Sequence, residues 1–338
     1  GQVTAQDSGG PLPVISVRVY DAATSSSLGS VSTDASGAYR FGSLASGNYK
    51  VRFYDNEGLY LTEYYRDKAD LASADLVPVT AGMTATVDAE LAPAAIVKGT
   101  VTDESGGAPL SNVQVTAYDA ATHDFLRSST TDSTGAYRVA GLAPGSCKLR
   151  FYDNEGVYVT EYYDNRPDLR SGDPVALTGG VTTTVNAELS QGATIEGTVT
   201  DETGGGPLGD IAVRIYDAET QNSLGTYYTD ASGFYQISAL RSGTYKLRFY
   251  DNAGVYLTEY HDDKMDLASA DRIAVASAST VTVDAALTQG GRITGRVIDA
   301  SSGLGLAGVS VHAERMDGTS PSGSATTKAD GTYTTTAL

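Results

Sequence analysis

The stretch from Arg52 to Tyr65, "RFYDNEGLYLTEYY", reveals the organisation of the chain because nearly the same sequence occurs two more times. They read "RFYDNEGVYVTEYY" from Arg150 and "RFYDNAGVYLTEYH" from Arg248. The spacing is 98 residues both times, with no insertion or deletion. The repeating unit of a solenoid has only about 20 to 50 residues, whereas a period near 100 is typical of whole domains. The period therefore predicts consecutive domains along one chain.

Shifting the chain by this period also aligns a set of glycines: Gly1, Gly99, Gly197 and Gly295. The 338 residues accordingly divide into three full repeats and the first part of a fourth: 1–98, 99–196, 197–294 and 295–338. About five residues separate the last strand of one repeat from the first strand of the next, which is too few for a flexible tether. Leu338 matches Leu44, so we expect the native polypeptide to continue with further 98-residue repeats.

Apolar residues alternate with polar ones inside each repeat. In "ISVRVYDA" the residues Ile15, Val17 and Val19 occupy every second position, and the later repeats keep the same phase. This period of two predicts strands that bury one face in a sandwich. Counting such segments gives about seven short strands per repeat and no helix beyond a single turn at 71–75. The fold class is therefore all-β, a tandem array of β-sandwich domains joined by short linkers.

The strand that contains Val51 and Phe53 follows the same rule. Its intervening residues, Lys50, Arg52 and Tyr54, are expected to point outward. The turns "TDASGAY", "TDSTGAY" and "TDASGFY" place a glycine two residues before a tyrosine that is predicted to point inward. Glycine adopts the positive φ that would close a hairpin with a bulge.

The segment "GTVTDESGGAPLSNVQVTAYDA" from Gly99, with "TDSTGAYRVAGLAPGSCKLRF" from Thr131, resembles bacterial carboxypeptidase regulatory-like domains. The marks are the G-x-V-x-D opening, the Pro-Leu pair, the D-x-x-G-x-Y turn and the G-x-Y-x-L-x-F strand. The resemblance implies a transthyretin-type, prealbumin-like sandwich, similar to the collagen-binding B-type repeats of surface adhesins. Domains of this family serve as spacers, adhesin stalks and appendages of enzymes.

The resemblance also brings in a covalent Lys–Asn bond that some B-type repeats contain. Only repeat 2 offers both groups, as Lys98 and Asn186. The alternation places both side chains on the solvent side, whereas the bond requires a buried lysine with a lowered pKa. We therefore expect no such bond here.

Composition limits the functions of the chain. The formal net charge of −18 opposes binding to nucleic acid or to an anionic membrane. No apolar run approaches the roughly 20 residues that span a bilayer. Cys147, the only cysteine, occupies the inward position that Tyr49 and Tyr245 hold in other repeats, so it is predicted to be a core residue. No nucleophile is paired with a base, and we expect no enzymatic activity.

The candidate site is the acidic and tyrosine-rich loop that begins inside each repeated phrase, at Tyr54 in repeat 1. Its carboxylates and amides could hold calcium through the residues Asp55, Asn56, Asp153, Asn154, Asp251 and Asn252. Its tyrosines could contact other repeats or other fibres through the residues Tyr60, Tyr64, Tyr65, Tyr158, Tyr162, Tyr163, Tyr256 and Tyr260. Two further interpretations remain open, a loop that only covers one end of its sandwich and a platform on which sugars stack.

These features favour a structural extracellular repeat protein of prokaryotic origin that forms a cell-surface fibre, filament or adhesin stalk. The expected partners are neighbouring repeats and other copies of the same fibre, with no nucleic acid and no membrane insertion in this segment. Calcium is the one candidate cofactor. One alternative is an adhesin array that binds carbohydrate or protein through the tyrosine loops. Another is a non-catalytic appendage of a secreted hydrolase.

Overall fold

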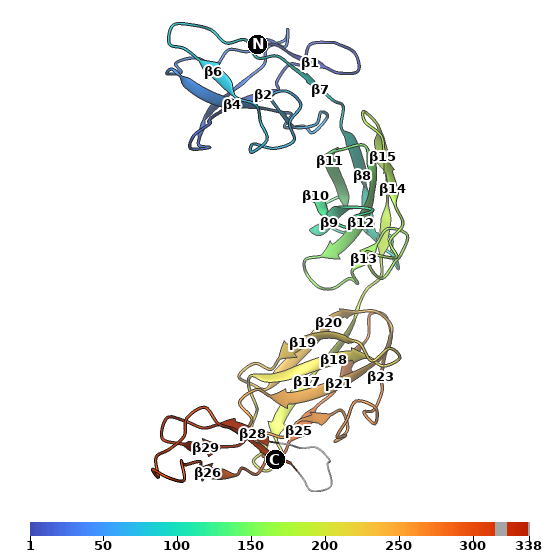
Figure 1. Ribbon diagram of the computed structural model, residues 1–338. Helices are drawn as coiled ribbons and strands as arrows, with labels where there is room; N and C mark the ends of the chain where they lie inside the picture. The colour runs from blue at the N-terminus through green and yellow to red at the C-terminus, as the bar shows by residue number, and fades with distance from the viewer. Residues whose placement is uncertain (315–322, 337–338) are drawn as a thin grey trace. The chain divides into compact units, whose positions relative to one another are not determined.

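The computed structural model describes residues 1–314 and 323–336 (Figure 1). They form two compact units, Gly1–Ser190 with repeats 1 and 2, and Gln191–Leu338 with repeats 3 and 4. Every regular element in the described residues is a strand, which confirms the all-β prediction. The predicted helical turn at 71–75 is a hydrogen-bonded turn instead. Within those same ranges, no helix is long and apolar enough to cross a membrane.

Repeat 2 shows the complete arrangement. Its strands are β8 (Ala95–Asp103), β9 (Val113–Asp119), β10 (Phe125–Thr130), β11 (Ala136–Leu142), β12 (Gly145–Asp153), β13 (Glu161–Tyr162), β14 (Val175–Leu177), β15 (Thr182–Thr184) and β16 (Ala187–Leu189). One sheet has the order β10-β9-β12-β13, with β14 also paired to β12 (Figure 1). The other has β11 antiparallel to β8, with β15 and β16 following each other parallel to β8. Counting β15 and β16 as one interrupted edge strand, and leaving out the two-residue β13, gives the seven predicted strands.

Repeat 3 reproduces this order strand for strand. Its strands are β17 (Ala193–Asp201), β18 (Ile211–Asp217), β19 (Ser223–Tyr228), β20 (Phe234–Leu240), β21 (Gly243–Asp251), β22 (Glu259–Tyr260), β23 (Ile273–Val275), β24 (Thr280–Thr282) and β25 (Ala285–Leu287). Both β8 and β17 begin four residues before the aligned glycine, so each sandwich includes the last residues of the preceding 98-residue block.

Repeats 1 and 4 contain fewer assigned strands. Repeat 1 has β1 (Val3–Ala5), β2 (Ser16–Asp21), β3 (Ser27–Ser32), β4 (Gly47–Tyr54), β5 (Glu63–Tyr64), β6 (Val77–Val79) and β7 (Ala89–Leu91). Its five-stranded sheet matches that of repeat 2, and β1 pairs with β7 in parallel. The described part of repeat 4 has β26 (Thr294–Arg296) on β29 (Thr332–Thr334) and β27 (Ser310–Ala313) on β28 (Gly323–Thr326).

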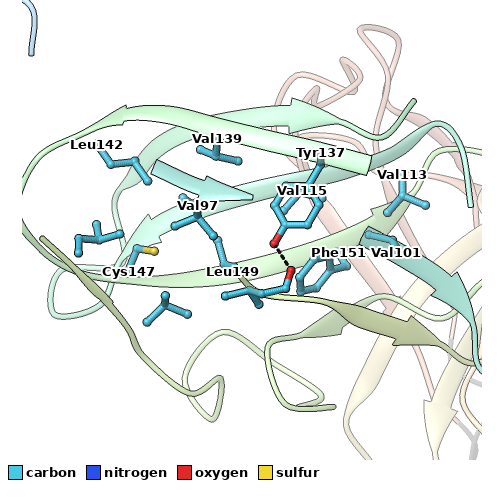
Figure 2. Close-up of a cluster of buried hydrophobic side chains, with 14 of the residues drawn as sticks. Val97, Val101, Val113, Val115, Tyr137, Val139, Leu142, Cys147, Leu149 and Phe151 are labelled. Carbon is cyan, nitrogen blue, oxygen red and sulfur yellow. Dashed lines mark hydrogen bonds between the residues drawn. The ribbon is translucent and has the colours of Figure 1, made fainter. Parts of the chain in front are cut away.

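The cores consist of the residues that the alternation predicted. Figure 2 shows this for repeat 2, where Val97 and Val139 from one sheet face Leu149 and Phe151 from the other. Cys147 is fully buried in this cluster, as predicted, and burial raises the pKa of its thiol to about 11. A thiol in this state is a packing residue rather than a reactive one.

The aligned glycines and the inward tyrosines act on the same backbone group. In repeat 2 the carbonyl of Val185, between β15 and β16, lies so close to Gly99 that a Cβ there would be 1.7 Å from the oxygen. The hydroxyl of Tyr137 donates a 2.7 Å hydrogen bond to that carbonyl (Figure 2). The ring of Tyr137 also packs edge-on against Phe151, with centroids 6.0 Å apart. Glycine is therefore required at this position because of a close backbone approach.

Two expectations from the sequence are wrong. The turn at Gly135, with φ of 74°, connects β10 of one sheet to β11 of the other, so it is an arch between sheets and closes no hairpin. The outer face of the five-stranded sheet is not left to solvent, since Ser16, Tyr20 and Lys148 on that face are all buried. A loop covers this face, and Lys148 holds it there through hydrogen bonds to the carbonyls of Leu169 and Arg170.

Candidate functional site

Each candidate loop begins with an aspartate that closes a tight turn. In repeat 2, Asp153 Oδ1 accepts a hydrogen bond from the backbone N–H of Glu155 at 3.0 Å, and Oδ2 accepts from those of Val157 and Tyr158 at 2.7 and 3.0 Å. Asp55 and Asp251 make the equivalent bonds in their repeats. Both oxygens of each carboxylate are thus engaged by the backbone, as in an Asx turn.

One of the calcium candidates makes a hydrogen bond outside the loop. The side-chain amide of Asn154 donates to the backbone carbonyl of Asn112 at 2.7 Å. Across the described residues, no group of three or more His, Cys, Asp or Glu side chains is placed to hold a metal ion. Calcium binding through the six candidate residues stays an untested prediction.

The first tyrosine of the loop ties it to the opening strand of the sandwich. The Tyr158 hydroxyl donates to Oδ2 of Asp103 at 2.7 Å, and the Tyr256 hydroxyl donates to Oδ2 of Asp201 at 2.8 Å. Bonds from the hydroxyls of Ser105 and Tyr158 lower the pKa of Asp103. Ala5 stands at this position in repeat 1, so Tyr60 has no such carboxylate there.

The candidate tyrosines divide into two groups by what they contact. One group packs against the hydrophobic core of its own repeat, and consists of Tyr60, Tyr65, Tyr158, Tyr163 and Tyr256. The other group, Tyr64, Tyr162 and Tyr260, lies half-buried on the short strands β5, β13 and β22. The structure thus gives every one of them a contact within its own repeat, and their role toward other copies stays a prediction.

Arginines accompany this second group on the outer face of the sheet. The guanidinium of Arg52 lies over the ring of Tyr54 at 4.5 Å and near that of Tyr64 at 6.0 Å. Arg150 over Tyr152 and Arg248 over Tyr250 repeat the closer contact at 4.6 Å. Stacking of this kind contributes roughly 0.5–1 kcal/mol at exposed sites and more when water is excluded. The outer face is therefore a packed layer of rings and guanidinium groups.

A lysine fixes the far end of the loop over this layer. Lys246 Nζ donates to the backbone carbonyls of Leu267 and Ala268 at 2.7 and 2.9 Å, and only 4% of the residue is exposed. Lys50 and Lys148 make the same pair of bonds in their repeats. Sequence analysis missed this role. The signal was that lysine returns at this position in all three repeats, whereas Lys98 becomes Glu196 and Thr294.

A glutamate of the loop lies half-buried beside other acids. Burial raises the pKa of Glu63 to about 7, and the charges of Asp67 and Glu90 add to the shift. Burial, Asp263 and Glu202 do the same for Glu259. Repulsion between carboxylates and loss of hydration both disfavour the charged form. These groups change charge near neutral pH.

The loop also pairs with the linker that leads to the next repeat. The N–H of Leu61 donates to the carbonyl of Ala92 at 2.9 Å, and the N–H of Ala94 donates to the carbonyl of Leu59 at 2.8 Å. On its other side the carbonyl of Ala94 accepts from the N–H of Gly180 in repeat 2 at 3.0 Å. Ala94 is buried. The linker is therefore a short segment hydrogen-bonded to the domain on each side, in agreement with the prediction that it is no flexible tether.

Comparison with known proteins places the chain in a family. The sequence model of the carboxypeptidase regulatory-like domain matches residues 96–190 and 194–288, more than half of the chain. The chain belongs to this family, as the resemblance implied. The SdrD B-like domain matches residues 4–100, so repeat 1 is similar to a second group of domains.

A curated relative and several solved structures are also similar. The serine-aspartate repeat-containing protein F of Staphylococcus epidermidis is 26% identical over 262 residues, which cover 66% of this chain and 16% of that protein. The minor pilin GBS52 of Streptococcus agalactiae is 13% identical with a TM-score of 0.29, over 58% of this chain and 96% of that one. The shaft pilin SpaA of Lactobacillus rhamnosus GG is 12% identical with a TM-score of 0.28, over 59% and 98%. Scores this low carry no inference about function.

Proposed function

We propose that this chain is a non-catalytic segment of a prokaryotic extracellular stalk or fibre, in which sandwich domains of one family act as spacers. The observation that carries the proposal is the linker at Ala92–Ala94, which is hydrogen-bonded to the repeat on each side of it. A linker that is hydrogen-bonded on both sides resists bending. Consecutive domains therefore extend the chain instead of folding back on one another.

Two other features support a spacer at the cell surface. The tandem repetition of one domain adds length without adding a new site, and the candidate tyrosines and aspartates all make contacts inside their own repeat. The net charge of −18 keeps the chain soluble and opposes its collapse onto other acidic surfaces. The relative from Staphylococcus epidermidis is named for its serine-aspartate repeats, and this chain covers only 16% of it.

Immunogold electron microscopy tests the location and shape together. An antibody raised against the full chain is applied to intact cells that carry it, and the expected result is gold on thin surface projections. Cells from which the gene for this chain has been deleted serve as the control for specificity. Labelling that appears only after the cells are broken would contradict the proposal.

A further inference from the structure

The turn that Asp55 closes presents two backbone carbonyls to the next repeat. Asp55 takes up the N–H groups of Glu57 and Leu59, so the peptide oxygens of Glu57 and Gly58 remain on the outer side of the turn. Arg138 Nη1 of repeat 2 donates to the carbonyl of Glu57 at 2.7 Å. The N–H of Gly141 donates to the carbonyl of Gly58 at 3.0 Å.

The receiving surface is a β-bulge. The pairing of β11 with β8 shifts register between Val139 and Leu142, and Gly141 has a φ of 72°. A bulge leaves its extra residue out of the ladder and turns the backbone groups of that residue outward. That is why the N–H of Gly141 is available to the neighbouring repeat rather than to β8.

Contact at this point is close enough to require glycine on the turn. Gly58 has a φ of 66°, and a Cβ there would lie 2.8 Å from the Cβ of Ala140. The second compact unit independently shows the same relation between repeats 3 and 4. Gly254 has a φ of 65°, and its Cβ would lie 2.7 Å from Cγ2 of Thr336. Gly254 and Thr336 each lie 196 residues, two full periods, beyond Gly58 and Ala140.

An arginine donates a hydrogen bond to the turn at both junctions, but the two arginines occupy different positions in their repeats. Arg292, in the linker before β26, donates through Nη2 to the carbonyl of Gly254 at 2.9 Å. In the first unit Arg138 of β11 donates to the carbonyl of Glu57, one residue earlier in the turn. The turn contributes only backbone oxygens, which explains why Ala253 can replace the glutamate found at position 57.

We propose that the turn at Glu57–Gly58 is a latch that fixes repeat 1 on the bulge of repeat 2, and that the turn at Gly254 fixes repeat 3 on repeat 4. The partner of this surface is a neighbouring domain of the same family, with an arginine placed to reach the turn. This inference rests on the stalk function proposed above and deepens it, because the latch adds a second contact, away from the linker, that fixes the angle between repeats.

The test measures the distance between repeats 1 and 2 in the full chain. Spin labels are attached to Ser30→Cys on β3 and Ser128→Cys on β10, both exposed, and the distance distribution is recorded by double electron–electron resonance. The latch gives one narrow distribution. Arg138→Ala and Gly58→Ala are each expected to broaden it at least twofold, and Arg138→Lys, which keeps a donor, should broaden it less.

Matched controls separate the latch from general damage. Arg40 is the counterpart of Arg138 in repeat 1 and lies outside this junction, so Arg40→Ala should leave the distribution narrow. Gly9 has the same φ of 66° with no atom within 4 Å of its Cβ position, so Gly9→Ala tests backbone strain without a clash. Circular dichroism verifies that every variant keeps its β structure.

A distribution that is broad in the unmodified chain, or unchanged by Arg138→Ala and Gly58→Ala, would overturn the latch. Neither result bears on whether the protein is displayed on cells. Conversely, a failure of surface labelling would overturn the stalk function and leave the latch intact.

Discussion

The hydroxyl of Tyr137 and the carbonyl of Val185, 48 residues apart in the chain, are joined by a 2.7 Å hydrogen bond inside the sandwich. Tyr235 and Val283 form the same pair at 2.6 Å in repeat 3. The bond holds the edge strand where it is interrupted, between β15 and β16 in repeat 2. Burial raises the pKa of Tyr137, so the hydroxyl remains a donor at any physiological pH.

Replacing Tyr137 with Phe removes the donor and leaves the ring in place against Phe151. The buried carbonyl of Val185 then lacks this partner, and the expected cost is about 1–2 kcal/mol of the stability of repeat 2. Urea unfolding, with hydrogen exchange read repeat by repeat, measures it. Tyr152→Phe, at an exposed ring, is the control, and equal behaviour of the two variants would contradict the assignment.

The sandwich and its core could be predicted from the sequence because burial on one face leaves a period of two. Val17, Phe53 and Cys147 were placed inward on that basis, and all three are buried. The path of a loop leaves no such period, so the cover over the outer face was missed. The bulge at Gly141 was missed as well. It depends on how β8 and β11 pair, and the local sequence of one strand does not specify its pairing with another.

The function of the candidate loop was harder to predict, for a related reason. Its acids suggested calcium and its tyrosines suggested contacts with other fibres, since both residue types suit those partners. In the structure Asp153 caps a turn and Tyr158 bonds Asp103. Backbone N–H groups bond the carboxylates of the loop, and backbone carbonyls form the contact between repeats. The sequence does not distinguish such groups, because every residue has them.

Lys246 offers a test of the loop cover. Lys246→Met keeps the length of the side chain but removes the charged donor to Leu267 and Ala268, and the expected loss is about 2–3 kcal/mol in repeat 3. Backbone amides of the turn at 266–270 should exchange faster. Lys98→Met, at an exposed lysine, should change stability by less than about 0.5 kcal/mol. If the two substitutions have the same effect, the lysine does not hold the loop.

Glu63 makes repeat 1 sensitive to pH. Its pKa of about 7 in the folded state is above the ordinary value of 4.5, so the folded state binds a proton that the unfolded state has already released. The contribution of the Glu63 proton to the stability of repeat 1 is fully present below about pH 4.5 and is lost as the pH rises through 7. Repeat 1 should therefore unfold at a temperature a few degrees higher at pH 5 than at pH 8, which is about 1 kcal/mol for a domain of this size.

Glu63→Gln should flatten this profile and raise the stability at pH 8, because the carboxylate no longer has to be charged beside Asp67 and Glu90. Glu57→Gln, at an exposed side chain in the same loop, should leave the profile unchanged. A slope that persists in Glu63→Gln would assign the pH dependence to another group.

The difference between repeats 1 and 2 at one position gives a further test. The Tyr158 hydroxyl bonds the carboxylate of Asp103, whereas repeat 1 has Ala5 where repeat 2 has Asp103. Tyr158→Phe should therefore destabilise repeat 2 by about 1–2 kcal/mol, since the acceptor is charged, and Tyr60→Phe should change repeat 1 by less than about 0.5 kcal/mol. Both rings pack on the core of their repeat, so any loss of packing affects the two variants alike. In a double-mutant cycle, Asp103→Ala should abolish the effect of Tyr158→Phe, because the two residues act as one pair. A cost for Tyr158→Phe that survives Asp103→Ala, or that Tyr60→Phe shares, would show that the ring and its surroundings, rather than this hydrogen bond, hold the loop on the sandwich.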